Sequence, residues 1–211
     1  MNRSQRPYLS LGPLGLGLLA SLGLLTPAPS SGAEGVRSGE ARRRWERLCR
    51  IRRDKFDLIL PGAMRDHGID MWIVMMKEGH HDPLYEDLGR GYPGRVAFYV
   101  FTDRGGDRIE RAALAVDGYM LEACGAYDLV RGDYDLKAFV AERAPKRIGV
   151  NMSEEMGSAD GLSHTAYLEL TKTLGEPWAS RVVSAERLVS AFTRWATWGT
   201  ATAPPSPGST R

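Results

Sequence analysis

The chain has 211 residues, of which 43% are hydrophobic and 26% charged, so collagen, coiled coil and wholesale disorder are excluded. This length allows one domain of ordinary size with tails. Arg3 and Arg6 are the only charged residues before Glu34, and the rest of the chain carries 26 basic and 26 acidic residues. Such a balance gives the chain no overall attraction for nucleic acid or for an anionic membrane.

The first 33 residues have the pattern of a secretory signal peptide. Arg3 and Arg6 form a positive start, and Leu9–Leu25 is an apolar segment. Ser31 and Ala33 are small residues at the positions that a signal peptidase requires. We therefore expect cleavage after Ala33 and a secreted or periplasmic protein. An uncleaved membrane anchor is the alternative, although the apolar segment is short for a bilayer and contains a proline.

Cys49 and Cys124 are the only two cysteines. In an oxidising compartment they could pair, but two cysteines are too few for a disulfide scaffold. We interpret them as buried, unpaired thiols, with pairing as the alternative.

The first half of the mature chain predicts a long helix, a buried strand and a hairpin. Apolar residues at three- and four-residue steps indicate a helix from Ser38 to about Asp66, split or kinked at Pro61-Gly62, with Gly68 as its C-cap. The continuous apolar run that follows predicts a buried strand. The expected segments are the strand Asp70–Met76, the polar loop Lys77–Gly94 with a short helix at Pro83–Leu88, the strand Arg95–Thr102, the turn Asp103–Asp107 and the strand Ile109–Val116.

The second half alternates between helix and strand patterns. The expected elements are a helix from Asp135 to Pro145, a strand Arg147–Asn151, a helix Leu162–Leu174, a strand Arg181–Ser184 and a helix Ala185–Phe192. This order predicts a three-layer α/β/α domain over residues 34–192, with a mixed sheet whose antiparallel part is the hairpin. Residues 193–211 are rich in Pro and Thr, and we expect them to be a disordered tail.

The densest cluster of potential metal ligands is His80-His81-Asp82. Three adjacent residues cannot easily face one metal ion, and no HxxxH or HExxH spacing accompanies them. We expect a polar loop in which Asp82 caps a short helix that opens at Pro83. Asp82 with Glu86 and Asp87 could form an acid/base pair, but a solvated helix face is the favoured interpretation. We predict no catalytic, cofactor-binding or metal-binding residue.

Two further motifs have simple structural interpretations. Asp103–Asp107 is glycine-rich but leads into a strand, whereas a phosphate loop leads into a helix. The basic stretch Arg42–Lys55 could bind an anionic surface, but Glu40, Glu46 and Asp54 dilute its charge, and a solvated outer helix face is favoured.

The segment Arg50–Met76 resembles the opening of the N-terminal domain of the aminopeptidase P, prolidase and creatinase family. In that family a helix ends in a Gly-Ile/Leu-Asp turn that feeds a core strand, and here the turn is Gly68-Ile69-Asp70. The Arg95–Val116 hairpin, the strand Lys146–Asn151 and the segment Val182–Val189 agree with this resemblance, which spans Ala41 to Phe192. The resemblance implies a creatinase-like N-terminal domain.

The family's catalytic "pita-bread" domain, which holds two divalent metal ions, has no matching segment here. The resemblance therefore implies a truncated, exported Xaa-Pro aminopeptidase relative without peptidase activity of its own. Its implied partners are a second copy of the chain or a peptidase catalytic domain. Two alternatives remain: a periplasmic ligand-binding or interaction module with a polar pocket near Lys77–His81 and Asn151–Glu155, and a membrane-associated protein held by an uncleaved Leu9–Leu25 segment.

Overall fold

The computed structural model describes residues 31–198 of a chain that divides into two units, residues 1–39 and residues 40–211. Of the first unit it describes residues 31–39, which are helical. The signal segment up to Ser30 and the predicted tail after Trp198 lie outside the described residues. None of the helices formed by residues 31–198 is both long enough and apolar enough to cross a bilayer.

The second unit is built on a six-stranded sheet in the order β4-β3-β2-β1-β5-β6. Only β2 is antiparallel to its neighbours, β1 and β3; the other neighbouring pairs are parallel, so the predicted mixed sheet is confirmed. The elements along the described chain are α1 (Ser31–Asp54), the π-helical segment η1 (Lys55–Ile59), α2 (Leu60–Asp66), β1 (Met71–Met76), α3 (Tyr85–Leu88), β2 (Tyr92–Thr102), β3 (Glu110–Asp117), α4 (Tyr119–Cys124), β4 (Leu129–Arg131), α5 (Leu136–Arg143), β5 (Ile148–Val150), the 3-10 turn η2 (Gly157–Ala159), α6 (His164–Leu174), the 3-10 turn η3 (Ala179–Arg181), β6 (Val182–Ser184) and α7 (Glu186–Trp198).

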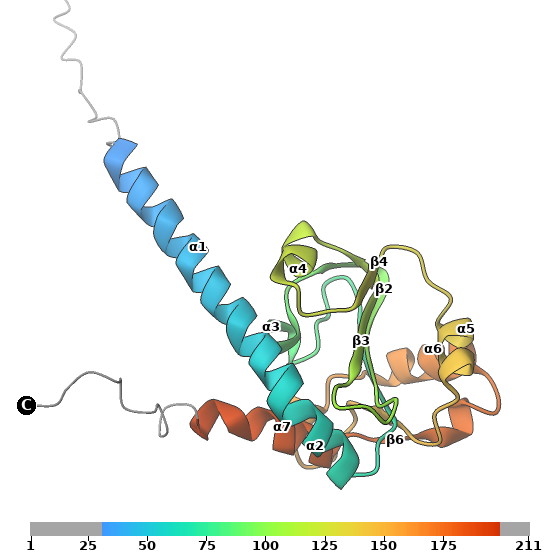
Figure 1. The fold of residues 1–211 in the computed structure, drawn as a ribbon. Helices are drawn as coiled ribbons and strands as arrows, with labels where there is room; N and C mark the ends of the chain where they lie inside the picture. The colour runs from blue at the N-terminus through green and yellow to red at the C-terminus, as the bar shows by residue number, and fades with distance from the viewer. Residues whose placement is uncertain (1–30, 199–211) are drawn as a thin grey trace, which may run out of the picture. The chain divides into compact units, whose positions relative to one another are not determined.

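Strand β1 lies inside the sheet and is buried on both faces, as its continuous apolar run predicts. Its alternate residues enter two separate cores. Trp72, Val74 and Met76 pack with η1, α2 and α7, whereas Met71, Ile73 and Met75 pack with α5 and α6. Helices therefore cover both faces of the sheet, and the α/β class is confirmed (Figure 1).

The turn between α2 and β1 is fixed by its three residues. Gly68 has a φ of +62° and closes α2 in a Schellman arrangement, in which its N–H donates to Arg65 O and the Ile69 N–H donates to Met64 O. Ile69 is buried in the core. The Asp70 carboxylate accepts hydrogen bonds from the backbone N–H groups of Lys146 and Arg147, just before β5. The predicted end of the helix at a glycine is therefore confirmed, with His67 as the C-cap residue and Gly68 directly after it.

The helix expected over Ser38–Asp66 begins earlier, at Ser31, and its split lies at Lys55–Ile59 rather than at Pro61-Gly62. Pro61 stands in the first turn of α2 and has no N–H to donate. Immediately before it, the Leu60 N–H donates to Lys55 O, five residues back, as in a π-helix. The helix is therefore irregular in the turn before the proline, at Lys55–Ile59, and not at the proline itself.

Several boundaries differ from the sequence prediction. Strand β2 begins at Tyr92 rather than Arg95, and α4 and β4 were not predicted. Strand β4 has only three residues, too few to show the alternation of apolar and polar residues that predicts a strand. It is a strand because it pairs with β3. Helix α7 continues past Phe192 to Trp198, because no Pro or Gly interrupts it before Gly199.

Candidate functional site

The structure separates the three members of the His80-His81-Asp82 cluster. His80 and His81 are exposed, and the His81 ring stacks on Tyr85 with ring centroids 4.1 Å apart. Asp82, in contrast, is only 2% exposed. Within residues 31–198, no group of three or more His, Cys, Asp or Glu side chains is placed to hold a metal ion.

Asp82 does not cap α3 as expected. The N-cap residue of α3 is Leu84, and the helix begins at Tyr85. Asp82 stands two residues before the cap, where its Oδ1 accepts a hydrogen bond from the Leu84 N–H at 2.9 Å. A local Asx turn explains this geometry, because a short side chain can bond a backbone N–H two residues ahead.

The second carboxylate oxygen of Asp82 belongs to a buried polar chain of three side chains. The Trp72 indole N–H donates to Asn151 Oδ1 at 2.8 Å, and Asn151 Nδ2 donates to Asp82 Oδ2 at 2.9 Å. The indole can only donate, so it fixes which end of the amide faces Asp82. Asp82 Oδ2 must therefore accept, a role that suits an ionised carboxylate.

This buried chain lies where an open α/β sheet would place a ligand. Asn151 directly follows β5, and the loop that carries Asp82 follows β1, so both lie beyond the carboxyl ends of two neighbouring parallel strands. The protein closes this position with its own backbone, since a Cβ built on Gly161 would be 1.9 Å from Asp82 Oδ2. The side chains of Trp72, Asn151 and Asp82 form hydrogen bonds with one another, and we interpret their role as structural.

The pKa of Asp82 is subject to opposing effects. Burial raises it above the ordinary value, because a buried carboxylate loses its hydration. The hydrogen bonds from Leu84 N–H and Asn151 Nδ2 stabilise the charged form and lower it, and burial is the larger effect.

The other residues expected near a ligand pocket are engaged or exposed. Lys77 pairs with Glu169 at 3.3 Å, and Ser153 donates a hydrogen bond to Glu186 at 2.6 Å. Glu154 and Glu155 are exposed.

A cavity of about 510 Å³ lies elsewhere, between the end of α2, strand β6 and the first turn of α7. Its lining carries side chains of both charges: Asp66, Arg147, Glu186 and Arg187. It borders the residues before β1 and β5, and not the segments Lys77–His81 and Asn151–Glu155.

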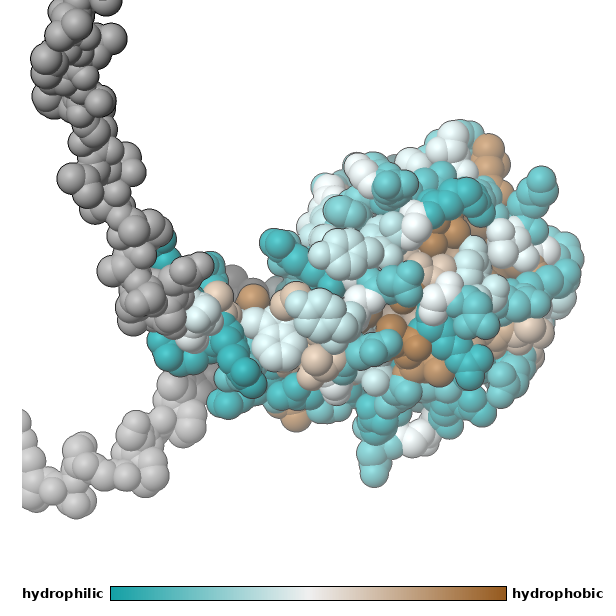
Figure 2. Space-filling view, turned by 90° about the horizontal axis from the view of Figure 1, so that it is seen from above, coloured by the Kyte–Doolittle hydropathy of each residue, from teal (hydrophilic) through white to brown (hydrophobic). Residues whose placement is uncertain are grey.

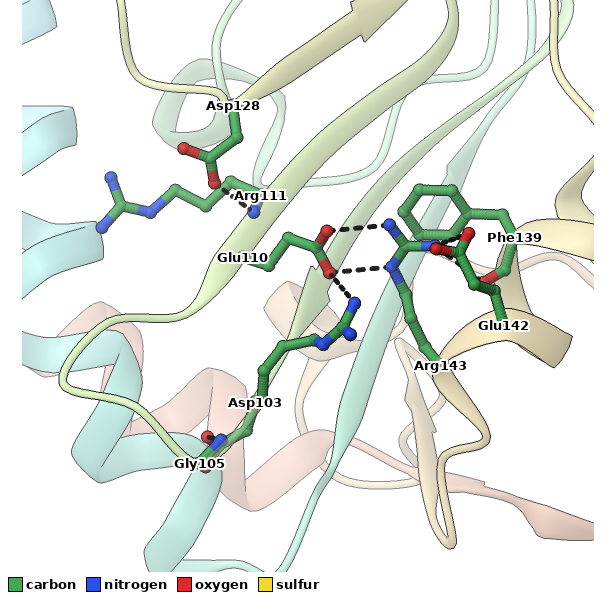
Figure 3. Close-up of polar contacts among 9 residues, drawn as sticks. Asp103, Gly105, Glu110, Arg111, Asp128, Phe139, Glu142 and Arg143 are labelled. Atoms are coloured by element: carbon green, nitrogen blue, oxygen red, sulfur yellow. Dashed lines mark hydrogen bonds and ion pairs between the residues drawn. The ribbon is translucent and has the colours of Figure 1, made fainter.

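A second polar cluster is centred on Glu110, at the start of β3 (Figure 3). Its carboxylate accepts two hydrogen bonds from Arg143, at 2.7 and 2.8 Å, and Arg104 lies 3.6 Å away. The Arg143 guanidinium also stacks over the Phe139 ring, 3.4 Å from its centroid. The bidentate pair joins β3 to α5 and holds the pKa of Glu110 below its ordinary value.

The interpretation of the cysteines as unpaired thiols is wrong. Both are buried as expected, but Cys49 in α1 and Cys124 at the end of α4 form a disulfide, with Cα atoms 5.3 Å apart. Sequence reasoning missed the pair because the cysteines are 75 residues apart and α4 was not predicted. The available signal was the even number of cysteines in a chain with a signal-peptide pattern.

No protein-family model, curated protein or solved structure matches this chain. Its function is therefore inferred from its own residues and their geometry.

Proposed function

We propose that residues 40–198 form a creatinase-like, non-catalytic N-terminal domain related to those of aminopeptidase P and prolidase. The turn Gly68-Ile69-Asp70 carries this proposal. Each of its residues has a separate task in joining α2 to the central strand β1: Gly68 provides the positive φ, Ile69 fills the core and Asp70 binds the segment before β5. The family resemblance, which spans Ala41 to Phe192, includes this turn, and the mixed sheet with helices on both faces supports it.

The domain's proposed role is structural support for a metallopeptidase catalytic domain or assembly with a second copy. The buried polar side chains at the expected ligand position support a non-catalytic role, because Trp72, Asn151 and Asp82 bond one another. In two-metal hydrolysis, carboxylates and a histidine converge on two ions and activate water. The proposal assigns that chemistry to the partner domain and none of it to this one.

Export to the periplasm or outside the cell is part of the proposal. The Cys49–Cys124 disulfide supports it, because such bonds persist mainly in oxidising compartments. The sequence pattern of residues 1–33 points to the same compartment.

The test combines an activity assay with an association assay. The purified chain alone should not hydrolyse Xaa-Pro peptides with Mn²⁺, Co²⁺ or Zn²⁺. It should form a complex with a separately produced Xaa-Pro peptidase catalytic domain that lacks its own N-terminal domain, as measured by light scattering, or else form dimers. Metal-dependent turnover by the chain alone that His81→Ala abolishes would overturn the proposal, and a monomer that binds no catalytic domain would also contradict it.

The cavity between α2, β6 and α7 favours a second candidate, a ligand-binding module. Its charged lining of both signs suits a small zwitterion such as an amino acid or dipeptide. Thermal unfolding with and without such ligands tests this candidate. A rise in the melting temperature that Arg147→Gln removes, with Arg131→Gln as the control, would favour it over the scaffold role.

A further inference from the structure

Helix α1 divides its arginines between two faces. Arg52 is buried and donates to the backbone carbonyls of Glu86 and Asp87, and Arg53 donates to the carbonyl of Cys124. These two side chains fasten the end of the helix to the domain. The arginines in the preceding turns of α1 have no such attachment to the domain within residues 31–198.

Six arginines of α1 are exposed, and four of them lie close together along the helix: Arg43, Arg44, Arg47 and Arg50. None of the four forms an ion pair with any residue in the described part of the chain. Arg42, on another side of the helix, pairs with Glu46 at 3.0 Å. Like charges at three- and four-residue steps repel one another, so these exposed arginines destabilise the isolated helix. An anionic partner would reverse that effect.

The exposed arginines lie beside exposed apolar side chains. Arg43, Arg47 and Arg50 form one row along the helix, and Arg44, Leu48 and Ile51 form the next. Leu48 is 47% exposed and Ile51 is 43% exposed. On the face drawn in Figure 2, in contrast, hydrophilic residues dominate and the hydrophobic ones form small separate patches. The two rows together, here called the α1 stripe, combine unpaired positive charge with accessible aliphatic surface.

We propose that the α1 stripe docks on an anionic phospholipid surface. Guanidinium groups bind phosphate with directed hydrogen bonds, and the neighbouring Leu48 and Ile51 can reach the boundary between headgroups and acyl chains. The balanced charge of residues 34–211 does not oppose this contact, because a screened interaction depends on charges within about 10 Å of the surface.

Two observations favour lipid over nucleic acid as the partner. The Cys49–Cys124 disulfide is typical of an oxidising compartment, where nucleic acid is not the expected ligand. The exposed Leu48 and Ile51 beside the arginines suit the boundary between headgroups and acyl chains, whereas a nucleic-acid backbone offers them no apolar surface.

The experiment is vesicle sedimentation with the exported chain, residues 34–211, which lacks the apolar segment Leu9–Leu25. Vesicles of phosphatidylcholine alone are compared with vesicles that contain one third phosphatidylglycerol, at low and high salt. We expect stronger binding to the anionic vesicles and weakening by salt. The variant R43Q/R44Q/R47Q/R50Q should reduce the binding to the level of phosphatidylcholine, since each arginine near an anionic surface contributes about fivefold in affinity. L48A/I51A should remove the part of the binding that resists salt.

The control variant R131Q/K137Q/K172Q/R187Q removes the same charge from exposed positions outside α1 and should bind like the wild type. Circular dichroism should show that both charge variants are folded. Equal binding to the two vesicle types, or unchanged binding by the α1 variant, would overturn the proposal. So would tighter binding to duplex DNA than to anionic vesicles through the same four arginines.

Discussion

Arg52 and Cys124 are in contact inside the domain, with Arg52 Nη1 3.0 Å from Cys124 Sγ. The same guanidinium donates to Glu86 O and Asp87 O, both at 2.9 Å. Burial lowers the pKa of Arg52, because the charged form loses its hydration. The buried guanidinium of Arg52 thus joins α1 to α3 and to the disulfide, and together these contacts hold the end of α1 against the domain.

Removal of the disulfide should therefore have a large effect on stability. Cys49→Ala/Cys124→Ala opens a connection between residues 75 apart, and the expected loss in the free energy of unfolding is about 4 kcal/mol. Urea denaturation measures it, and the wild type in reducing agent serves as the control and should approach the variant. Two free thiols in the air-oxidised wild type, found by mass spectrometry, would contradict the pairing.

Trp72 contributes both packing and a hydrogen bond. Trp72→Ala should cost about 3–5 kcal/mol, because the side chain is fully buried on the central strand. Trp72→Phe keeps an aromatic ring but leaves Asn151 Oδ1 without its hydrogen-bond donor. This should lower the free energy of unfolding by about 1–3 kcal/mol.

The control is Trp45→Phe, because Trp45 is partly exposed and its indole N–H has no hydrogen-bond partner among the described residues. Denaturant titrations of the three variants give the comparison. A near-neutral Trp72→Ala would mean that β1 is not a core strand.

Local chemistry predicted much of the fold. The apolar run of β1, the glycine stop at Gly68 and the start of α5 near Asp135 were all visible in sequence. Segments whose structure depends on residues far away in the sequence could not be predicted. Strand β4 exists through its pairing with β3, and the bond between Asp82 and Asn151 joins residues 69 apart. The sequence showed Asp82 as a polar loop residue, since nothing near it in the chain reveals that it is buried.

Glu110 should stabilise the fold at neutral pH and lose this effect in acid. Its hydrogen bonds with Arg143 lower its pKa below the ordinary value of 4.5. A carboxyl group whose pKa falls on folding stabilises the folded state above its unfolded pKa, and this contribution disappears as the pH falls through the folded pKa. In Glu110→Gln the free energy of unfolding should therefore decrease less steeply than in the wild type as the pH falls. Glu142→Gln, which changes an exposed partner of Arg143, is the control and should keep the wild-type slope.

Asp82 should show the opposite pH dependence. Burial raises its pKa above the ordinary value of 3.8, so the folded state holds the proton more tightly than the unfolded state does. The stability that this group contributes is present below the unfolded pKa and is lost as the pH rises through the folded pKa. Carbon-13 NMR titration of the Asp82 carboxyl measures the value directly. A pKa below 3.8 would show that the hydrogen bonds from Leu84 and Asn151 outweigh burial.

Gly161 should not tolerate a side chain. A Cβ at this position would be 1.9 Å from Asp82 Oδ2 and 2.8 Å from Pro83 Cδ, so the loop that carries Asp82 would have to move. Gly161→Ala should therefore cost about 1–3 kcal/mol in the free energy of unfolding, as overpacked sites do.

The movement should also disturb the bond between Asp82 and Asn151, and through Asn151 the indole N–H of Trp72. The NMR chemical shift of that N–H should change in Gly161→Ala. Gly157→Ala is the matched control, because a Cβ there meets no atom within 4 Å. It should leave the indole signal in place and lower the stability less. If both variants behaved alike, Gly161 would not be closing the carboxyl ends of β1 and β5, and that position would be open to a ligand.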